Sequence, residues 1–417
     1  MYRCITELCG IVFDIDGFSD AELAVIKSEF GNYRTLCMTF SDSGVSRLKT
    51  YFIDDQIHRV ERFQRFFAPN KATHVKTLKK LGVRATELLY VSKRIDFLRN
   101  AMGFMGGTAW VTKTVSYENA STAPDLICES LLELSDYIKN NVRGFFGEVV
   151  IYPDMKKKRG VLIPVDFSTD NGLIRLYMLG RYFGYTQYMS QLHPYSSAIF
   201  LNKRVGGKAY GSFNKIFEKL LIKTVKHIQI EHTIDGICSV PPRPGVADRF
   251  SNMLREVADK AHIEDLSTYL VCKYDYPSQK GLTFQERKKN IKGVFAFEDD
   301  LTGKSVVIVD DIVTTGATLN ECISVLYEAG AAKVVAIAFA INQYGRGYWT
   351  SNVIQVSCPT CSSKMRLLIN SHNRSFFYSC MECRKSKDFE NGRKEIELLV
   401  NGEFNEEDVE NDPLNWD

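Results

Sequence analysis

The chain of 417 residues is too long for one ordinary hydrophobic core, and its length suggests two or three domains. Its 53 Lys and Arg residues nearly balance its 50 Asp and Glu residues, so the net charge of +3 excludes a polycation adapted to coat nucleic acid. No run of about 18 uncharged apolar residues is present, and the N-terminus carries no signal-peptide cleavage pattern. We therefore expect no membrane span and a cytoplasmic location.

Residues 1–135 alternate short apolar runs with helix-like stretches such as Ala72–Leu81 and Asp125–Leu134. Such alternation is typical of βαβ units arranged around a parallel sheet. The sequence therefore predicts a first domain of the α/β class over this part of the chain.

Residues 136–194 have a less regular pattern. Gly144–Val150 and Gly160–Val165 have the composition of strands, and Leu173–Phe183 resembles a helix. We expect this part to connect the domains on either side of it, and its sequence indicates no function.

Residues 195–345 return to an α/β pattern and predict a second domain with a parallel sheet. The predicted helices are Asn214–Lys226, Phe250–Lys260 and Leu319–Ala329. The predicted strands are Gly236–Val240, Val306–Val309 and Val334–Phe339.

The C-terminal part differs in composition from the rest. Residues 355–400 are polar and cysteine-bearing, and the stretch Cys358–Lys387 holds six Lys or Arg residues and one acid. The last part, residues 401–417, holds seven acids and no Lys or Arg. The sequence thus predicts a small third domain followed by a solvated acidic tail.

A strand, a turn and a helix around residue 310 form the strongest functional signal. The apolar strand Val306–Val309 ends in two acids, Asp310 and Asp311, and a Thr/Gly loop leads into the next helix. Backbone N–H groups of Thr314–Thr318 at a helix N-terminus favour an anion, and Gly316 permits a tight turn. Two carboxylates at the strand end suit hydrogen bonds from sugar hydroxyls. The pattern predicts a phosphosugar site.

This stretch resembles the motif with which type I phosphoribosyltransferases bind phosphoribosyl pyrophosphate (PRPP). The flanking segment Ile237–Ala258, an apolar strand followed by Val-Pro, a basic residue and a helix, resembles the ComF/GntX-like branch of that family. A second flanking segment, Ser278–Phe297, resembles the same branch. Its matching residues are Gln279, Leu282, Arg287, Asn290 and Phe295.

The resemblance implies a role for each matching residue. Asp310 and Asp311 would accept hydrogen bonds from the ribose hydroxyls. The 5′-phosphate would be held by Thr314, Thr315, Gly316, Ala317 and Thr318. The diphosphate loop would contain Pro241, Pro242 and Arg243. Lys273 and Arg287 are further basic candidates for the diphosphate, and Mg²⁺ would neutralise that leaving group.

Asp14 and Asp16 directly follow an apolar strand near the N-terminus, and Gly17 comes next. This pattern resembles the first motif of haloacid-dehalogenase-like (HAD) phosphatases, in which the first acid is the nucleophile. The positions carried over from that family are Asp14, Asp16, Ser41 and Lys71. Lys93 stands where the family has a metal-binding acid, and its ammonium would repel or replace the metal. The Rossmannoid first domain is thus either a phosphatase or an inactive HAD fold that binds a phosphate or a partner.

Two CxxC pairs lie near the C-terminus, namely Cys358 with Cys361 and Cys380 with Cys383, separated by 18 residues. This spacing is typical of a zinc ribbon with four thiolate ligands, which leaves no open metal position and indicates a structural Zn²⁺. A redox pair is the alternative. The segment between the pairs interleaves basic and aromatic residues, which suits single-stranded nucleic acid, or else a small core with solubilising charge. These residues are Lys364, Arg366, His372, Arg374, Phe376, Phe377 and Tyr378.

The sequence favours an enzyme that transfers phosphoribose from PRPP to an acceptor that it does not identify: a nucleotide, a metabolite or a nucleic acid. A role in bacterial stress or phage defence is suggested by analogy alone. One alternative is a non-catalytic sensor of PRPP or a nucleotide that signals to a protein partner. Another is a ComF-like factor for nucleic-acid uptake or repair.

Overall fold

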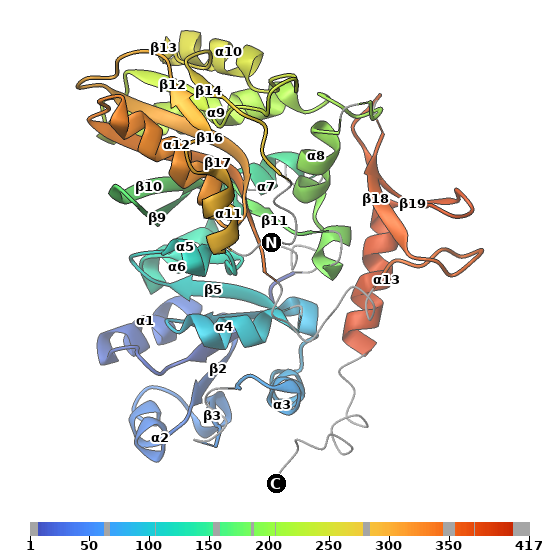
Figure 1. The fold of residues 1–417 in the computed structure, drawn as a ribbon. Helices are drawn as coiled ribbons and strands as arrows, with labels where there is room; N and C mark the ends of the chain where they lie inside the picture. Colours follow the sequence, from blue (N-terminus) through green and yellow to red (C-terminus); the bar gives the residue numbers. More distant parts are fainter. Residues whose placement is uncertain are drawn as a thin grey trace.

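The computed structural model describes residues 7–61, 67–104, 106–152, 159–184, 187–204, 206–277, 284–344, 355–370 and 372–402. Gln279, Leu282 and the acidic tail beyond residue 402 therefore lie outside the described residues. Figure 1 shows one α/β unit at the bottom, a second at the top, and the C-terminal part along the right-hand side. Within the described part of the chain, no helix is long and apolar enough to cross a membrane.

The first unit is a six-stranded parallel sheet with the strand order β3-β2-β1-β4-β5-β6. Its strands are β1 (Gly10–Asp14), β2 (Arg34–Thr39), β3 (Ile57–Arg59), β4 (Leu88–Ser92), β5 (Gly107–Val111) and β6 (Leu126–Cys128). Its helices are α1 (Asp20–Phe30), α2 (Asp42–Leu48), α3 (Lys71–Leu81), α4 (Ile95–Met102), α5 (Tyr117–Ala120) and α6 (Leu131–Lys139). This order confirms the parallel α/β sheet that the alternating pattern predicted.

The first sheet is covered on both faces. Along β1, Val12 belongs to one hydrophobic cluster, while its neighbours Ile11 and Phe13 belong to another. Successive side chains of a strand point to opposite faces, so the two clusters lie on the two sides of the sheet. This double burial explains why β1, β4 and β5 are buried throughout and lack polar alternation.

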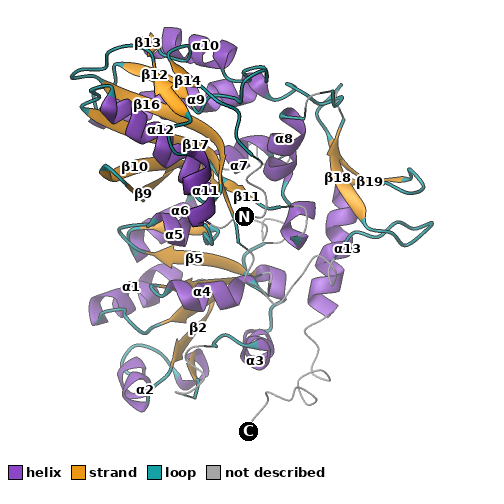
Figure 2. Cartoon of the chain, viewed as in Figure 1, coloured by secondary structure: helices purple, strands orange, loops and turns teal. Residues whose placement is uncertain are grey.

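The second unit is a seven-stranded sheet with the order β13-β12-β16-β17-β10-β9, in which β11 also pairs with β17. Its strands are β9 (Ile163–Thr169), β10 (Gly172–Met178), β11 (Arg181–Tyr182), β12 (Gly236–Ser239), β13 (Glu264–Asp265), β16 (Ser305–Val313) and β17 (Lys333–Asn342). Smaller strand pairs are β7 (Val142–Phe145) with β8 (Arg159–Val161), and β14 (Leu270–Cys272) with β15 (Phe295–Phe297). The helices are α7 (Phe146–Ile151), α8 (Pro194–Asn202), α9 (Asn214–Glu231), α10 (Ser251–Ala261), α11 (Phe284–Ile291) and α12 (Ala317–Glu328). Figure 2 shows these helices flanking the orange strands.

Part of the expected connecting segment, residues 136–194, belongs to the second sheet, namely β9, β10 and β11. β9 and β10 form an antiparallel hairpin, and β10 pairs in parallel with the central strand β17. The helix expected at Leu173–Phe183 is instead β10 and β11. Ile174 and Leu176 are buried while Leu173 and Arg175 are exposed, which is the period-two pattern of a strand.

Two other boundaries also differ from the prediction. The strand expected at Gly144–Val150 ends at Phe145, where α7 begins. The helix expected at Asp125–Leu134 is divided between β6 and α6. In α6 the hydroxyl of Ser130 accepts a hydrogen bond from the Glu133 N–H, and this N-cap marks the true start of the helix.

The C-terminal part packs against both units. It consists of a three-stranded sheet, with β18 (Met365–Ile369), β19 (Phe376–Cys380) and β20 (Ser386–Asp388), followed by α13 (Phe389–Gly402). The buried Tyr378 hydroxyl donates to the Gln191 carbonyl at 2.6 Å, before α8. From α13, Arg393 donates to the Tyr152 hydroxyl at 2.9 Å, and Glu397 lies 3.6 Å from Arg84 of the first unit.

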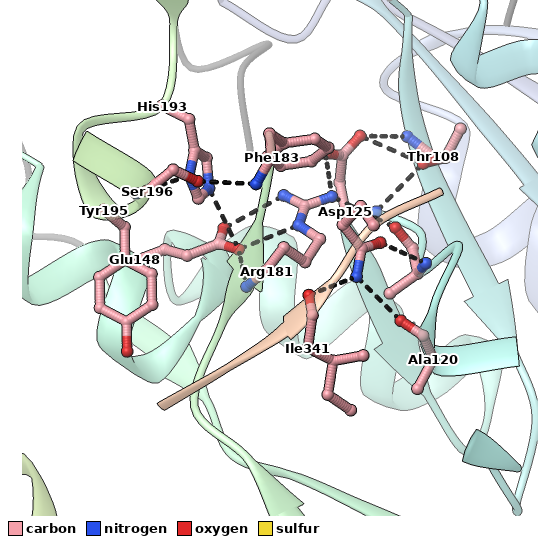
Figure 3. Close-up of polar contacts among 12 residues, drawn as sticks. Thr108, Ala120, Asp125, Glu148, Arg181, Phe183, His193, Tyr195, Ser196 and Ile341 are labelled. Atoms are coloured by element: carbon pink, nitrogen blue, oxygen red, sulfur yellow. Dashed lines mark hydrogen bonds and ion pairs between the residues drawn. The ribbon is translucent and has the colours of Figure 1, made fainter. Parts of the chain in front are cut away.

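A buried charged cluster joins the two sheets (Figure 3). Arg181 of β11 donates to Asp125 of the first unit at 3.0 Å and to both carboxylate oxygens of Glu148 in α7, at 2.9 and 3.1 Å. The His193 ring lies 3.4 Å from the same Glu148 carboxylate. Burial alone would raise the pKa of Glu148, but the surrounding groups, Arg181 and His193 among them, together hold that pKa well below its ordinary value. The two sheets are thus joined by a buried cation, Arg181, that pairs with a carboxylate from each side, Asp125 and Glu148.

Candidate functional site

The two acids of the central motif lie at the carboxyl end of β16, between β12 and β17. This strand continues to Val313, four residues beyond the predicted end, so both acids lie within it. Each carboxylate accepts a hydrogen bond from the next backbone N–H, Asp310 from Asp311 and Asp311 from Ile312, both at 2.7 Å. Both side chains are partly exposed rather than enclosed in the core. A ligand can therefore reach them at the sheet edge where α/β proteins bind ligands.

Asp311 is held by two cations that the sequence reasoning did not single out. Arg249, just before α10, lies 2.8 Å from its carboxylate, and Lys203, just after α8, lies 3.4 Å away. Burial raises the pKa of Asp311, but Lys203, Arg249 and the hydrogen bond from the Ile312 N–H together lower it below its ordinary value. Arg249 follows the expected diphosphate loop by six residues.

Asp310 has a different electrostatic environment from its neighbour. Burial, together with the adjacent Asp311 carboxylate, raises the pKa of Asp310 to about 7. Within the described residues, the hydrogen bond that its side chain makes is the one from the Asp311 N–H. Its remaining lone pairs can accept hydrogen bonds from a sugar or bind a hard cation.

The loop after β16 has the geometry of an anion site. Gly316 has a φ of +77° and is the N-cap of α12, which begins at Ala317. In the described part of the chain, none of the turn, loop and cap hydrogen bonds uses a backbone N–H of residues 314–318 as its donor. These N–H groups lie where the helix dipole adds positive potential, so the predicted phosphate loop Thr314–Thr318 has donors to offer a phosphate.

The basic candidates divide into one beside the loop and two elsewhere. Arg287 of α11 donates to the Thr314 hydroxyl at 3.0 Å, which brings it to the phosphate loop. Arg243 follows Pro241 and Pro242 after β12, and it donates to the Pro277 carbonyl at 3.2 Å and stacks on Tyr276 at 4.3 Å. Lys273 is exposed, 5.8 Å from the Tyr274 ring. The described side-chain contacts of Arg243 and Lys273 are thus with residues 274–277 and not with Asp310 or Asp311.

A cavity of about 450 Å³ opens beside Arg249. It is lined by Asn202, Tyr210, Gly211, Asn214, Lys215, Glu218, Asp248, Arg249, Asn252, Met253, Arg255 and Glu256. A smaller cavity that shares Arg249 and Asn202 with it extends to Asp311. Open space therefore adjoins Asp311 on the side of α9 and α10.

The acidic pair and the phosphate loop lie in a part of the chain that matches a known protein family. Residues 256–365 match the family model of the phosphoribosyl transferase domain. The matched region contains the acidic pair, the phosphate loop and Arg287. The chain thus contains a phosphoribosyltransferase domain, in agreement with the parallel sheet and the sequence motif.

Curated relatives match over short stretches of this chain. The DNA utilization protein YhgH of Escherichia coli O6:H1 is 38% identical over 80 residues, covering 17% of this chain and 35% of that protein. The competence protein F of Haemophilus influenzae is 30% identical over 91 residues, covering 21% and 38%. The ribose-phosphate pyrophosphokinase of Sulfolobus acidocaldarius is 39% identical over 87 residues, covering 19% and 28%. The chain spans about a third of the length of these relatives. A solved structure of Leishmania donovani UMP synthase covers 82% of this chain and 87% of its own, at 12% identity, but its TM-score of 0.22 adds no argument.

The acids of the first unit occupy a closed environment. Asp14, at the end of β1, is fully buried and accepts hydrogen bonds from Ser92 and from the Arg94 guanidinium, both at 2.7 Å. Arg94 in turn stacks on Phe40 at 4.9 Å. Burial raises the pKa of Asp14 although Arg94 opposes it. This arrangement encloses the carboxylate instead of presenting it to a substrate.

The other HAD-like candidates lie on neighbouring elements. Asp16 is partly exposed just after β1. Ser41 is the N-cap of α2, where its hydroxyl accepts from the Gly44 N–H at 3.0 Å. Lys71 is the first residue of α3. Lys93, in the expected metal position, forms an ion pair with Glu22 at 2.7 Å and not with Asp14. The residue that neutralises the expected nucleophile is therefore Arg94, which the sequence pattern did not indicate.

We predict that Lys93→Asp creates no phosphatase activity, because Arg94 still pairs with Asp14. Hydrolysis of p-nitrophenyl phosphate with Mg²⁺ by the purified variant measures this. The matched comparison is Lys93→Asp with Arg94→Ala, which removes the guanidinium from Asp14 as well. Turnover by the single variant above the wild-type background would contradict the assignment of Arg94 as the blocking residue.

The four cysteines of the C-terminal part converge as the spacing predicted. Their sulfur atoms all lie within 4.8 Å of one another, with Cys358 and Cys383 3.3 Å apart and Cys361 and Cys380 3.5 Å apart. Four sulfurs around a tetrahedral Zn²⁺ are about 3.8 Å apart, because each Zn–S bond is about 2.3 Å long. Ser362 and Arg384 adopt left-handed φ angles of 58° and 61° as each knuckle turns. The cluster is therefore compatible with a zinc site.

We predict about one zinc ion per chain in the purified protein, and less than about a tenth of that in Cys358→Ser or Cys380→Ser, because three thiolates hold Zn²⁺ much less tightly than four. Elemental analysis by plasma mass spectrometry measures the content. Cys272→Ser, outside the cluster, is the control. Wild-type protein free of zinc after growth in zinc-supplemented medium would exclude a structural zinc ribbon.

The aromatic residues between the two pairs mostly serve the core of this part. Phe376 and Tyr378 are buried, and both rings pack against Phe389 of α13, with centroids 6.0 Å away. Phe377 is partly exposed. Of these three aromatic side chains, Phe377 is therefore the one with exposed surface that could stack on a base. The small-core alternative thus accounts for two of the three aromatic residues.

Proposed function

We propose that this chain is a phosphoribosyltransferase that uses PRPP with Mg²⁺ to transfer ribose 5-phosphate to an acceptor. The observation that carries the proposal is the pairing of two accessible carboxylates at the end of β16 with a loop of available N–H donors. The match of residues 256–365 to the phosphoribosyl transferase domain supports it.

The proposed reaction breaks the bond between the ribose anomeric carbon and the diphosphate oxygen. A nucleophilic atom of the acceptor forms the new bond at that carbon, and the acceptor gives up a proton. The loop Thr314–Thr318 holds the 5′-phosphate, while Asp310 and Asp311 accept hydrogen bonds from the ribose hydroxyls and fix the ring. Arg287, 3.0 Å from Thr314, adds positive charge beside the phosphates. The reaction needs no protein nucleophile.

The residues present fit a Mg²⁺ ion at this site. Asp310 retains acceptor capacity beyond the N–H of Asp311, and Mg²⁺ is commonly held by one or two carboxylates together with substrate phosphates. When bound, the ion supplies positive charge that stabilises the departing diphosphate. Asp310 and the diphosphate oxygens would hold it, since Asp311 is already paired with Arg249 and Lys203.

The experiment that tests the proposal follows labelled PRPP in a cell extract supplemented with the purified protein. The expected result is diphosphate release together with label transferred to a new compound, both dependent on the protein and on Mg²⁺. Binding of PRPP without turnover in any extract would favour the sensor. Absence of both binding and turnover would overturn the phosphoribosyl proposal.

A nucleic-acid role is the second candidate, favoured by the printed names of two relatives, a DNA utilization protein and a competence protein. The basic residues of the zinc-ribbon segment and the partly exposed Phe377 would supply its contact surface. Its test is binding of a single-stranded oligonucleotide measured at several salt concentrations, since phosphate contacts weaken as salt increases. Unchanged affinity in a Phe377→Ala variant would show that Phe377 does not stack on a base.

We predict that PRPP affinity increases as pH rises through about 7, because the pKa of Asp310 is raised to about 7 and the charged carboxylate accepts sugar hydrogen bonds better. Calorimetric titrations between pH 6 and pH 8 measure the effect, which we expect to be up to about tenfold. Asp310→Asn is the control, because it removes the titrating group and with it this part of the pH dependence. For folding the sign is opposite: a carboxyl whose pKa is raised from 3.8 to about 7 contributes stability at low pH that is lost as pH rises through 7.

A further inference from the structure

The connection between β5 and β6 leaves the first unit and reaches the phosphate loop of the second. Asp166 of β9 donates its backbone N–H to the Val115 carbonyl at 2.7 Å, and Tyr344, after β17, donates to the Ser121 carbonyl at 2.8 Å. Gln343 accepts from the Ala123 N–H at 2.8 Å and donates to the Ala120 carbonyl at 3.0 Å. This connection, which contains α5, is thus bound to the second sheet along its length.

The same connection is also fixed to its own unit. Arg99 of α4 donates to Asn119 at 3.0 Å and to Thr122 at 2.8 Å. Asp125, at the end of the connection, accepts from the Thr108 N–H of β5 at 2.9 Å and binds Arg181 at 3.0 Å. Because both ends are held, α5 has a defined position relative to the loop that it contacts.

Tyr117 makes the contact with the phosphate loop itself. Its side chain is 8% exposed, and its hydroxyl donates to the Thr314 carbonyl at 2.6 Å. The Tyr344 hydroxyl approaches the same carbonyl at 3.3 Å from a more exposed position. The Tyr117 ring packs edge-on against Phe167 at 4.9 Å. The ring of Phe167 lies 2.6 Å from the place where a Cβ on residue 316 would be, so only glycine fits there.

These contacts determine how one peptide group of the loop is turned. In a trans peptide the C=O of one residue and the N–H of the next point in opposite directions. With the Thr314 carbonyl directed at two tyrosine hydroxyls, the Thr315 N–H points away from them. That N–H donates no described loop hydrogen bond, and it belongs to the group assigned to the 5′-phosphate. Burial raises the pKa of Tyr117, so its hydroxyl remains a donor at any physiological pH.

We propose that Tyr117, a residue of the first unit, is a positioning residue for the phosphate loop of the second, orienting the Thr314–Thr315 peptide so that the Thr315 N–H faces the phosphosugar. This inference rests on the proposed function, because it takes the loop to be the phosphate site. It assigns the first unit a role that requires no catalysis at Asp14. The phosphosugar site is then completed by two segments more than 190 residues apart in the sequence, since 197 positions separate Tyr117 from Thr314.

The test compares Tyr117→Phe with the wild-type chain in calorimetric binding of ribose 5-phosphate and of PRPP. The substitution keeps the ring against Phe167 and removes only the hydroxyl. We expect the affinity for both ligands to fall about fivefold, as for the loss of one hydrogen bond, with a melting temperature within about 3 °C of wild type. Tyr344→Phe, which removes the longer bond, should have a smaller effect. Tyr33→Phe, elsewhere in the first unit, is the matched control and should leave binding unchanged.

The outcomes separate this inference from the function on which it rests. If the wild-type chain binds neither ligand, the proposed function fails. If the wild-type chain binds and Tyr117→Phe binds equally well, the positioning role is overturned while the proposed function stands. A loss of affinity shared by Tyr33→Phe would likewise overturn it, because the effect would then be general to the first unit. As a second measurement, bound phosphate should slow hydrogen exchange of the peptide containing Thr315 in wild type more than in Tyr117→Phe.

Discussion

Asp310→Asn combined with Asp311→Asn should lower the affinity for PRPP by about a hundredfold or more. Each ribose hydroxyl loses a charged acceptor, and a hydrogen bond to a charged group contributes about 1.5–3 kcal/mol. Isothermal calorimetry with PRPP and Mg²⁺ measures the loss. Unchanged affinity would show that the acids at the end of β16 do not hold the sugar.

The single variants should distinguish the two acids. The raised pKa of Asp310 means that a neutral amide there costs the fold little, so Asp310→Asn should keep the wild-type melting temperature. Asp311→Asn leaves Arg249 and Lys203 without their counter-charge and should melt lower. Asp299→Asn, an exposed acid before the start of β16, is the control and should change neither property.

Arg181→Met should destabilise the chain by about 3–5 kcal/mol, the usual cost of removing one partner of a buried ion pair. Arg181 is 3% exposed, and its loss removes the guanidinium that pairs with the buried carboxylates of Glu148 and Asp125. Urea unfolding followed by circular dichroism measures the change. Adding Glu148→Gln and Asp125→Asn should restore part of the lost stability, because the buried charges that Arg181 compensated are then gone.

A surface arginine on the neighbouring strand provides the matched control. Arg175 of β10 pairs with Asp166, but its side chain is 43% exposed, so Arg175→Met should cost no more than about 1 kcal/mol. Equal losses for the two arginines would mean that the cluster in Figure 3 contributes no more than an ordinary surface pair.

Local patterns in the sequence were sufficient to predict the centre of the second unit. The strand before Asp310 is apolar because both faces of β16 are buried there, and Gly316 is required by the turn into α12. The cysteine cluster was predictable for the same reason, since each CxxC pair fixes two sulfurs on one short turn. In both cases the residues that make the structure are neighbours in the chain.

What the sequence did not reveal depends on residues that are distant in the chain. Lys203, just after α8, and Arg249, just before α10, both reach Asp311, and no spacing rule connects either of them to it. The pattern at Lys93 indicated the wrong cation at Asp14, because the backbone turn after Ser92 brings Arg94 there instead. The sequence of Leu173–Phe183 resembles a helix, but its pairing with β17 makes it a strand. Strand propensity depends on the neighbouring strands, which are distant in the sequence.

The helix that ends the described chain has a thermodynamic consequence. α13 follows directly from the cysteine-bearing sheet and contacts the first unit, with Asn401 donating to Thr86 at 3.4 Å and Glu397 near Arg84, while Arg393 reaches Tyr152. A ligand that binds only the folded state stabilises every part whose unfolding it opposes. Metal held by the cysteines would therefore raise the melting temperature of the parts of the chain that α13 contacts. Removing the metal with a chelator would destabilise these contacts, which lie far from the thiolates.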